Sequence, residues 1–339
     1  MRTKQSQALS IKDVAKLAGV SISTVSRVIN KGPGVKKKNL AKVQEAVKQL
    51  NFKPSVFAQR LASGRSNVIA LVIPKFEGIF YSFYVLELLR GVGTIAAVSK
   101  LDLLLHISDD YSDLNLSGVG GVIFADVIKN RVQVEDALAR GVPTVVINNY
   151  VEDLDVNCIA IDNRGGAEAA TNYLIGLGHK RVAHITGELL TQAAMHRFEG
   201  YKRALKKHDI PFNEQYVAKT DYSRGQARQA AEKLLKLPQP PTAIFVASDS
   251  MALEVMTVAR ERGVRVPSQL SLVGFDDNPS GLYGPVALTT VRQPLVKMAQ
   301  DAVKELIVLM NLKKKTQAVK KVYLPAELVI RESAQPRSS

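Results

Sequence analysis

A short stretch near the start of the chain carries side chains that can recognise DNA bases. Residues 21–30 read Ser-Ile-Ser-Thr-Val-Ser-Arg-Val-Ile-Asn. Hydroxyl groups can accept from or donate to bases and phosphates, and an Arg side chain can make a bidentate contact to guanine. At helical spacing these polar side chains lie mostly opposite an apolar face that contains Ile22 or Val25 together with Val28 and Ile29. The residues of this stretch that we expect to contact DNA are Ser21, Ile22, Ser23, Thr24, Ser26, Arg27 and Asn30.

Two neighbouring helices must hold this stretch in place. Apolar residues recur at helical spacing over 11–18, and Gly19 then supplies the backbone freedom that a sharp turn needs. Ser21 can cap the second helix. Two short helices joined in this way form a helix-turn-helix, whose second helix enters the major groove of DNA. The alternative is a small helical hairpin with a polar surface.

A third helix is expected over residues 37–50. Lys36 stands at its cap position, where it weakens the cap because Lys has no side-chain acceptor for the free backbone N–H groups. The apolar stripe of this helix is expected to consist of Leu40, Val43, Ala46, Val47 and Leu50.

Positive charge is concentrated in the first fifth of the chain. Residues 1–65 hold 14 Lys and Arg against 2 Asp and Glu, which is a net charge of +12 out of the formal +15. A compact basic segment on a nearly neutral body is typical of a nucleic-acid-binding head. The alternative is a solvated basic tail, and the apolar periodicity inside the segment argues against it.

Residues 51–65 form a linker that contains a short helix. Pro54 and Ser55 can begin this helix and Gly64 can end it. About two turns of helix are too short to be stable alone in water. The alternative is an ordinary interdomain linker with incidental helicity.

Beyond residue 66 the pattern changes to short apolar runs that alternate with helix-period segments. Alternating strands and helices predict parallel, doubly wound sheets. The 274 residues that follow residue 65 are too many for one such sheet, so two α/β lobes are expected. The apolar runs are 68–73, 101–107, 119–124, 144–147, 182–185, 243–247 and 270–275, and the helical segments include 164–177, 197–208, 224–237 and 250–262.

Composition argues against several classes of protein. The chain has no run of eighteen apolar residues and no apolar core behind its N-terminal charges, so neither a membrane span nor a secretory signal is expected. Cys158, the single cysteine, is a core residue rather than a reactive thiol on this interpretation. The five histidines show no metal-ligand spacing, and no nucleophile or dinucleotide motif is present. We therefore expect no enzyme activity, no cofactor and no metal site.

The first helices and six later motifs resemble one family of bacterial regulators. Residues 14–30 follow the order Val-Ala-x-x-Ala-Gly-Val-Ser-x-x-Thr-Val-Ser-Arg-x-x-Asn. The later motifs are 162–166, 176–181, 197–201, 248–252, 273–277 and 288–294. With them the chain resembles the lactose-repressor/galactose-repressor (LacI/GalR) family over nearly its whole length.

The resemblance implies a sequence-specific, DNA-binding transcriptional repressor of the bacterial cytoplasm, associated with the nucleoid. It implies an N-terminal all-α helix-turn-helix head and an α/β core of two doubly wound parallel-sheet lobes, similar to periplasmic binding proteins. A homodimer on a pseudo-palindromic operator is expected, with a tetramer as the alternative. The chain would cross between the lobes near residues 160, 291 and 323.

The resemblance also implies domain boundaries. The DNA-binding head would span 1–53, the hinge helix 54–65, and the core 66–332, with a tail over 333–339. Lobe 1 would contain 66–160 and 292–323, and lobe 2 would contain 161–291 and 324–332. In the hinge, Leu61 would insert into the central minor groove, a kind of contact that is known to kink DNA. Ser55 and Arg60 are the other DNA contacts expected there.

A small molecule between the lobes would control operator affinity. Ligands of open α/β sheets bind at the carboxyl ends of strands. The expected effector contacts are Phe80, Tyr81, Asn148, Arg197, Tyr222, Ser248, Asp249 and Asp276. Two non-binding alternatives stay open, because Asp249 can cap the following helix and Asp277 can hold the Asn278-Pro279 turn.

The identity of the effector stays open. A sugar or sugar derivative is expected, although many sugar-binding members have Asp and Asn where this chain has Asn148 and Ser248. A purine or nucleoside corepressor and a protein coregulator are alternatives. A transport protein is a further rival, against which the basic helix-turn-helix weighs heavily.

The chain departs from the family in two places. The connection over 74–91 is longer than usual and aromatic-rich. Only 11 residues separate the runs that end at Ile107 and begin at Val119, whereas a parallel crossover with a full helix needs a dozen or more. A helix is therefore expected to be missing, which would make the N-terminal lobe smaller and alter its dimer contacts.

Overall fold

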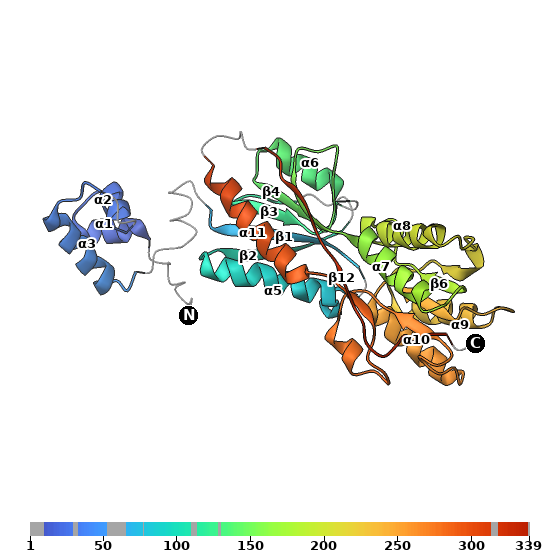
Figure 1. Ribbon diagram of the computed structural model, residues 1–339. Coiled ribbons are helices and arrows are strands. Elements are labelled where there is room, and N and C mark those ends of the chain that lie inside the picture. Colours follow the sequence, from blue (N-terminus) through green and yellow to red (C-terminus); the bar gives the residue numbers. More distant parts are fainter. Residues whose placement is uncertain are drawn as a thin grey trace. The chain divides into compact units, whose positions relative to one another are not determined.

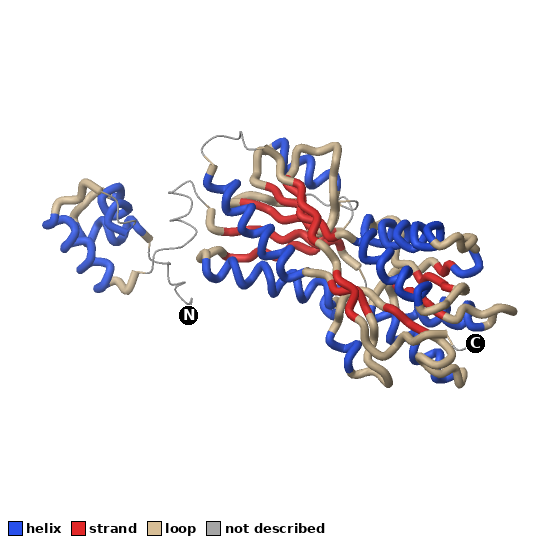
Figure 2. Tube along the Cα trace, viewed as in Figure 1, coloured by secondary structure: helices blue, strands red, loops and turns tan. Residues whose placement is uncertain are grey.

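The computed structural model describes residues 10–29, 33–52, 66–76, 78–109, 114–127, 130–312 and 318–337. Contacts divide the chain into two units, Met1–Asn67 and Val68–Ser339, and each is described by itself. In the described residues, Figure 2 shows helices joined by loops in the first unit and a mixture of helices and strands in the second. In the described part of the chain, no helix is long and apolar enough to span a membrane.

The described residues of the first unit form three helices, as predicted: α1 (Ile11–Ala18), α2 (Ile22–Ile29) and α3 (Lys37–Gln49). Gly19 ends α1 with φ 63°, in the left-handed region that favours glycine. Ser21 begins α2, because its Oγ accepts a hydrogen bond from the backbone N–H of Thr24 at 3.3 Å. Lys36 precedes α3 without any side-chain cap, also as predicted.

Of the two residues that were alternatives for the core of α2, Val25 fills it: Val25 is fully buried against Val14 and Val43, whereas Ile22 is 46% exposed. One detail of the predicted head is wrong, because Leu40 is 38% exposed, although it was expected in the apolar stripe of α3. It lies in the first turn of that helix, and the buried face of α3 begins one turn later at Val43.

The N-terminal lobe of the second unit is built on a six-stranded parallel sheet with the order β11-β5-β4-β3-β1-β2 (Figure 1). Helices α5 (Phe83–Val98) and α11 (Leu295–Asn311) pack on one face, and α6 (Arg131–Ala139) packs on the other. The strands are β1 (Val68–Pro74), β2 (Asp102–Ser108), β3 (Gly121–Phe124), β4 (Thr144–Ile147), β5 (Asn157–Ile161) and β11 (Lys321–Leu324).

The C-terminal lobe is built on a four-stranded parallel sheet with the order β7-β6-β8-β9. Helices α7 (Asn163–Gly176) and α8 (Gln192–Lys207) cover one face, and α9 (Arg224–Leu235) and α10 (Asp249–Glu261) cover the other. The strands are β6 (Val182–Ile185), β7 (Val217–Ala218), β8 (Ala243–Val246) and β9 (Ser271–Val273). Both sheets carry helices on both faces, which confirms the predicted doubly wound α/β core.

Three passages of the chain join the lobes. The first leads from β5 into α7, the second runs through β10 (Thr290–Arg292) into α11, and the third runs from β11 into β12 (Glu327–Val329). Strands β10 and β12 pair antiparallel as a sheet of their own. Three short 3-10 helices complete the described elements: η1 (Ile79–Tyr81), η2 (Glu214–Tyr216) and η3 (Pro279–Leu282).

The connection between β2 and β3 forms no helix in its described residues, 109 and 114–120, as its length predicted. Leu114 and Leu116 are buried there and pack on the face of the sheet that also carries α6. Two leucines on a loop cover less surface than a helix. Leu104 of the edge strand β2 is accordingly exposed.

Candidate functional site

The second helix of the head presents a polar, exposed face. Ser21, Ser23 and Arg27 are exposed on it, and Thr24 and Ser26 are half-buried. The Oγ of Ser21 lies 2.9 Å from both the Oγ of Ser23 and the Oγ1 of Thr24, so the three hydroxyls form one connected group. Asn30 and the expected hinge contacts Ser55, Arg60 and Leu61 lie outside the described residues.

Positively charged side chains are also exposed on the neighbouring helix, α3. Lys37, Lys38, Lys42 and Lys48 of α3 are all exposed. Lys side chains at such positions contact phosphates and supply sequence-independent affinity, while the hydroxyls and Arg27 on α2 can read bases. The first unit therefore has both parts of a DNA-binding surface.

In the second unit, several predicted effector contacts meet where the lobes join. Asn148 comes from the N-terminal lobe directly after β4, and its φ of 60° is one that Asn tolerates better than most residues. Its Oδ1 is buried and has no hydrogen-bond partner among the described residues. Tyr84 of α5 lies beside it, and its hydroxyl donates to the carbonyl oxygen of Ala125 at 3.1 Å.

Tyr84 and Asp126 belong to this group, although the sequence analysis did not single them out. Burial raises the pKa of Tyr84, the charge of Asp126 raises it further, and a hydrogen bond with Asn148 acts in the opposite direction. The signal for Asp126 was present in the sequence, because it follows the carboxyl end of β3 by two residues. Tyr84 lay at the end of the aromatic-rich segment.

Arg197 reaches the group from the C-terminal lobe. It is buried in the second turn of α8, so the expectation that it begins a helix is wrong: Thr191 caps α8 and Ala193 and Ala194 are already buried. Its Nε donates to Oδ1 of Asn163 at 2.8 Å and its Nη1 to the carbonyl oxygen of Ala247 at 2.6 Å. The guanidinium carbon lies 3.8 Å from the centre of the Phe275 ring.

Asp276 follows β9 at the second passage between the lobes. Gln293, which the sequence analysis missed, donates from Nε2 to Oδ1 of Asp276 at 2.6 Å. Burial raises the pKa of Asp276 to about 6, and the positive charge of Arg197 opposes that rise. Asp276 has φ 132° and Asp277 has φ 59°, and such conformations persist only where the surrounding structure holds them.

Tyr222 completes the group from the loop after β7. Its ring lies so close to Gly187 that a Cβ on that glycine would come within 2.0 Å of it. Burial raises the pKa of Tyr222, Arg197 opposes this, and Asp276 and Asp126 add to it. We call Tyr84, Asp126, Asn148, Arg197, Tyr222, Asp276 and Gln293 the interlobe cluster.

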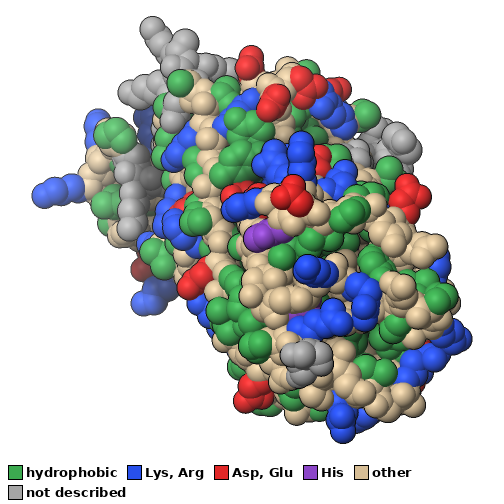
Figure 3. Space-filling view, turned by 45° about the vertical axis from the view of Figure 1, so that its right-hand side comes forward, with side chains coloured by type: hydrophobic (Ala, Val, Ile, Leu, Met, Phe, Trp, Pro, Cys, Tyr) green, Lys and Arg blue, Asp and Glu red, His purple; other side chains and the backbone are tan. Residues whose placement is uncertain are grey.

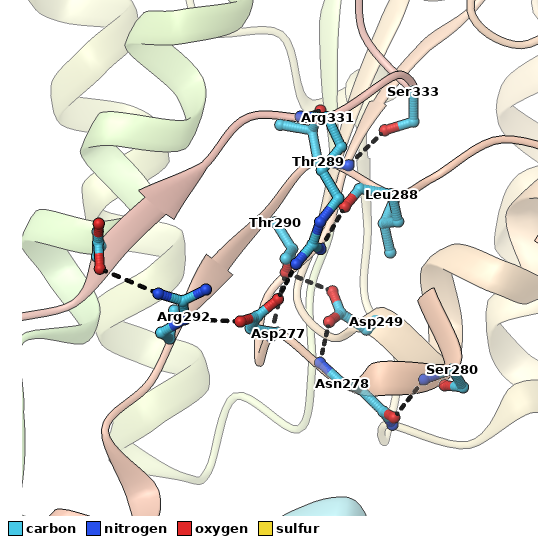
Figure 4. Close-up of polar contacts among 11 residues, drawn as sticks. Asp249, Asp277, Asn278, Ser280, Leu288, Thr289, Thr290, Arg292, Arg331 and Ser333 are labelled. Carbon is cyan, nitrogen blue, oxygen red and sulfur yellow. Dashed lines mark hydrogen bonds and ion pairs between the residues drawn. The ribbon is translucent and has the colours of Figure 1, made fainter. Parts of the chain in front are cut away.

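The polar side-chain atoms of Ser248 and Asp249 are engaged within the protein, and Figure 4 shows the contacts of Asp249. Ser248, not Asp249, caps α10 and accepts from the backbone N–H of Met251 at 3.4 Å. Asp249 accepts from Oγ1 of Thr290 at 2.6 Å and from the backbone N–H of Asn278 at 2.7 Å. Burial raises the pKa of Asp249 to about 7, and the negative charge of Asp276 contributes to the rise.

Asp277 joins the loop after β9 to two of the crossing segments. Its carboxylate lies 2.6 Å from Nε of Arg292 on β10 and 2.5 Å from Nη2 of Arg331, just beyond β12. Figure 4 shows both ion pairs, together with Asp249, Thr290 and Asn278. The turn at Asn278 is held by its own side chain, which accepts from the backbone N–H of Ser280 at 3.0 Å, so Asp277 is not needed for that purpose.

The remaining predicted contacts lie apart from these interactions. Phe80 and Tyr81 are in η1 and are 66% and 92% exposed.

A separate contact joins the lobes through Gln192, the first residue of α8. Its side chain accepts from the backbone N–H of Tyr150 at 2.6 Å and donates to the carbonyl oxygen of the same residue at 2.9 Å.

Comparisons with known proteins agree with this arrangement. The family model described as "Bacterial regulatory proteins, lacI family" matches residues 10–55, and the one described as "Periplasmic binding protein-like domain" matches residues 171–334. The chain is 34% identical over 337 residues to the catabolite control protein A of Priestia megaterium, with 96% of this chain and 99% of that protein covered. The chain belongs to the lacI family of bacterial regulatory proteins.

Two solved structures of transcriptional regulators extend the comparison. The lac repressor dimer bound to operator and the anti-inducer ONPF superposes with a TM-score of 0.80 at 26% identity, covering 96% of this chain and 99% of that one. The transcriptional regulator CelR–cellobiose complex superposes with a TM-score of 0.72 at 29% identity and the same coverage. These findings confirm the family, the fold and the function predicted from the sequence: the protein is a DNA-binding transcriptional repressor.

Proposed function

We propose that a small molecule held by the interlobe cluster controls how tightly this repressor binds its operator. The proposal rests on the observation that the residues of the cluster come from different parts of the core. Asn148 comes from the N-terminal lobe, Arg197 and Tyr222 come from the C-terminal lobe, and Asp276 and Gln293 lie at a passage between them. A ligand that touches all three parts favours one arrangement of the lobes over another.

The physical requirement for control is a difference in affinity between two arrangements of the protein. A ligand shifts the equilibrium only as far as that difference allows, and the coupling between ligand and DNA is reciprocal, typically about 1–3 kcal/mol. Of the two similar structures, one contains cellobiose and the other contains the anti-inducer ONPF. They support a small-molecule effector here, with a sugar or sugar derivative as the first candidate and a purine nucleoside as the second.

We propose Asn148, Arg197, Tyr222 and Asp276 as effector contacts, and we add Tyr84, Asp126 and Gln293. Asp249 and Ser248 are assigned a supporting role because their polar atoms are already used within the protein. Phe80 and Tyr81 are left out because they are exposed on η1.

A thermal-shift screen of sugars, sugar phosphates and nucleosides on the full chain tests the proposal. A ligand at 100 times its Kd adds about 2.7 kcal/mol to the free energy of unfolding. A compound that stabilises the protein must then change its affinity for labelled operator DNA. That effect should be lost in Asp276→Ala. Full responsiveness of this variant would place the effector site elsewhere.

We propose further that the repressor is a homodimer on a pseudo-palindromic operator. The dimeric lac repressor supports this, as do large apolar side chains exposed on α5 (Leu86, Val98) and at η3 (Leu282, Tyr283). Residues 1–53 would form the DNA-binding head, and 54–65, with Leu61, would form the hinge. Sedimentation equilibrium gives the mass in solution: twice the chain mass is expected, whereas the mass of a single chain would overturn the dimer.

We infer that the protein acts by binding and catalyses no reaction, because its relatives are regulators. Its site of action would be the chromosome in the bacterial cytoplasm. Incubation of any effector found in the screen with the protein, followed by mass spectrometry, should return the effector unchanged.

A further inference from the structure

A groove outside the interlobe cluster lies along one edge of the C-terminal lobe. Strand β7 forms that edge of the sheet, and the groove is lined by residues of α8, β7 and α9. Its volume is about 690 Å³, and sites for small molecules measure about 300–1,000 Å³. None of the residues that line it belongs to the interlobe cluster, so a molecule bound there would occupy a second site.

Aromatic rings form part of the groove wall. Phe198 of α8 contacts Phe212, which follows that helix, with 6.1 Å between the ring centres. Phe198 is held in place because it also stacks on His184 and Tyr201, and both of these rings are buried. Phe212 is 45% exposed. The two rings therefore offer a firm apolar surface that a flat ring of a ligand can cover.

Positive charge lines the same groove. Three exposed lysines contribute it, one on α8, one directly after β7 and one on α9: Lys202, Lys219 and Lys233. The neighbouring carboxylates Glu199 and Glu232 form ion pairs with arginines and not with these lysines. Glu214 is the one carboxylate among the lining residues. A hollow lined mainly by one sign of charge concentrates ions of the opposite sign, so the groove favours anions.

The charged and the aromatic parts of the groove are adjacent. The Nζ atom of Lys202 lies 4.6 Å from the centre of the Phe198 ring, within the range of a cation–π contact. Figure 3 turns the side of the molecule that carries α8 and α9 toward the viewer, and Lys and Arg side chains are frequent over the lower half of that face. One ligand can therefore place an anionic group and a flat ring side by side.

The edge strand itself offers little to an extended peptide. Strand β7 has two residues. The backbone N–H of Val217 donates to the carbonyl oxygen of Glu214, and the carbonyl oxygen of Ala218 accepts from the N–H of Thr186 at 2.9 Å. A short edge strand beside a lysine is how many proteins prevent the addition of another strand. The groove thus suits a small molecule better than a polypeptide.

We propose that this groove binds a nucleoside polyphosphate, with the base against Phe212 and the phosphates among Lys202, Lys219 and Lys233. Lys binds phosphate as a point charge, without the fixed geometry that Arg requires. Stacking on an aromatic side chain accepts any base, because every base has a π-face. Gln229 of α9 also lines the groove, and its amide can donate to and accept from the base or the ribose. This site is independent of the small molecule proposed for the interlobe cluster.

Titration of the full chain with a ribose-labelled fluorescent ATP in magnesium-free buffer tests the inference, followed by displacement with unlabelled compounds. We expect saturable binding that ATP and GTP both displace. Adenosine, which lacks the phosphates, and tripolyphosphate, which lacks the base, should each compete at least about tenfold more weakly. Failure of the nucleotides to bind, or competition by tripolyphosphate as strong as that of ATP, would overturn the inference.

A triple variant locates the phosphates: Lys202→Gln, Lys219→Gln and Lys233→Gln. We expect it to bind ATP at least about tenfold more weakly than wild type, because three charge-assisted contacts are lost. The matched control replaces three exposed lysines outside the groove, two on α8 and one before β6: Lys206→Gln, Lys207→Gln and Lys180→Gln. The control has the same net charge as the triple variant and should bind like wild type. Equal weakening in both would assign the binding to the overall charge of the protein and overturn the inference.

A single variant tests the base. Phe212→Ala should weaken ATP by about fivefold or more and leave tripolyphosphate unchanged, because only the stacking contact is removed. Loss of ATP binding in Asp276→Ala, with normal binding by the triple lysine variant, would place the nucleotide in the interlobe cluster. That result would overturn the inference and leave the proposed function standing. Displacement of the labelled nucleotide by hexaglutamate at lower concentration than by ATP would make the occupant an acidic polypeptide, which would also overturn it.

Discussion

Arg331 and Asp277 are 54 residues apart in the sequence, and their side chains form an ion pair with Nη2 of the arginine 2.5 Å from Oδ1 of the aspartate. The pair is shielded from solvent, since both side chains are about 15% exposed. Arg292 meets the other oxygen of the same carboxylate. Asp277 thereby connects the loop that carries Asp276 to two of the three passages between the lobes.

The variant Asp277→Asn should destabilise the protein by about 3 kcal/mol, because it leaves Arg331 in a shielded position without its counter-charge. Asn tolerates the φ of 59° at this position, so backbone strain does not confuse the result. Urea unfolding of the full chain measures the change. The control is Glu327→Gln, which removes the exposed partner of Arg292 and should cost under about 1 kcal/mol. Equal losses in both variants would contradict a special role for Asp277.

Titration of Asp277 should also make the free energy of unfolding depend on pH. Burial raises the pKa of this carboxyl, but hydrogen bonds from Arg331 and Arg292 outweigh it and lower the pKa overall below 3.8. A lowered pKa contributes stability that is present above 3.8 and is lost as the pH falls through the folded-state value. The destabilisation caused by Asp277→Asn should therefore shrink when unfolding is measured in strong acid. A difference that stays constant down to the lowest pH at which the protein folds would count against this.

Because of His184, the protein should lose stability at mildly acidic pH. It is fully buried on β6, stacks on the ring of Phe245 at 4.6 Å, and its pKa falls to about 4 because burial disfavours the charged form. The unfolded chain binds a proton near pH 6.5 and the folded protein does not, so stability is present above 6.5 and is lost as the pH falls towards 4. Between pH 7.5 and 5.0 this residue should account for about 2 kcal/mol.

The variant His184→Leu should reduce that difference between the two pH values, whatever it does to absolute stability. Comparison with wild type cancels the contributions of Asp249 and Asp276, whose raised pKa values act in the opposite direction. A pH dependence in His184→Leu identical to wild type would show that this histidine does not titrate as described.

Gly187 should tolerate no side chain. A Cβ there would lie 2.0 Å from the Tyr222 ring, so Gly187→Ala must displace that ring. We expect a loss of about 1–3 kcal/mol in the free energy of unfolding, as for other overpacked sites. Gly176→Ala is the matched control, because nothing lies within 4 Å of the added methyl group at the end of α7, and it should be neutral or slightly stabilising. Tyrosine fluorescence of both variants would report whether a ring has moved.

Arg27→Ala should weaken binding to a specific DNA site by about 1–3 kcal/mol if Arg27 reads a base. It should matter much less on random DNA. A site selected from random sequence by the wild-type protein provides the substrate, and fluorescence anisotropy provides the affinity. Lys48→Ala on α3 is the control and should weaken both DNAs alike, as a phosphate contact does. Equal losses for Arg27→Ala on both DNAs would make Arg27 a phosphate contact.

A fragment that begins at Ser66 should keep its fold and lose DNA binding. Residues 1–65 carry a net charge of +12, and contacts between lysines and phosphates release counterions, so binding by the full chain should fall steeply with salt. Circular dichroism checks the fold of the fragment, and anisotropy at several salt concentrations checks DNA binding. Undiminished DNA binding by the fragment would show that residues 1–65 are not needed to bind DNA.

Local sequence patterns were sufficient to predict the helices of the head and the α/β class of the core. Helical periodicity, Gly19 and Ser21 predicted a helix-turn-helix because capping and turning depend on neighbours within a few residues. The seven apolar runs all proved to be strands, because buried parallel strands read as continuous apolar segments. Strands β5, β7, β10, β11 and β12 are not among those runs. Strands β7, β10 and β12 have only two or three residues, which leave little periodicity, and polar residues begin β5 (Asn157) and β11 (Lys321).

The chemistry of the proposed effector site depended on tertiary structure. The sequence placed Asn148, Arg197, Tyr222 and Asp276 at strand and helix ends, where ligands bind. It could not show that Gln293 would use its amide nitrogen on Asp276, or that Asn163 and Ala247 would occupy two nitrogens of Arg197. Which acceptors stay open is decided by pairings between residues 17 to 50 positions apart. Hydrogen bonds are satisfied by whichever group lies nearest in space, and folding, not the order of residues along the chain, sets that proximity.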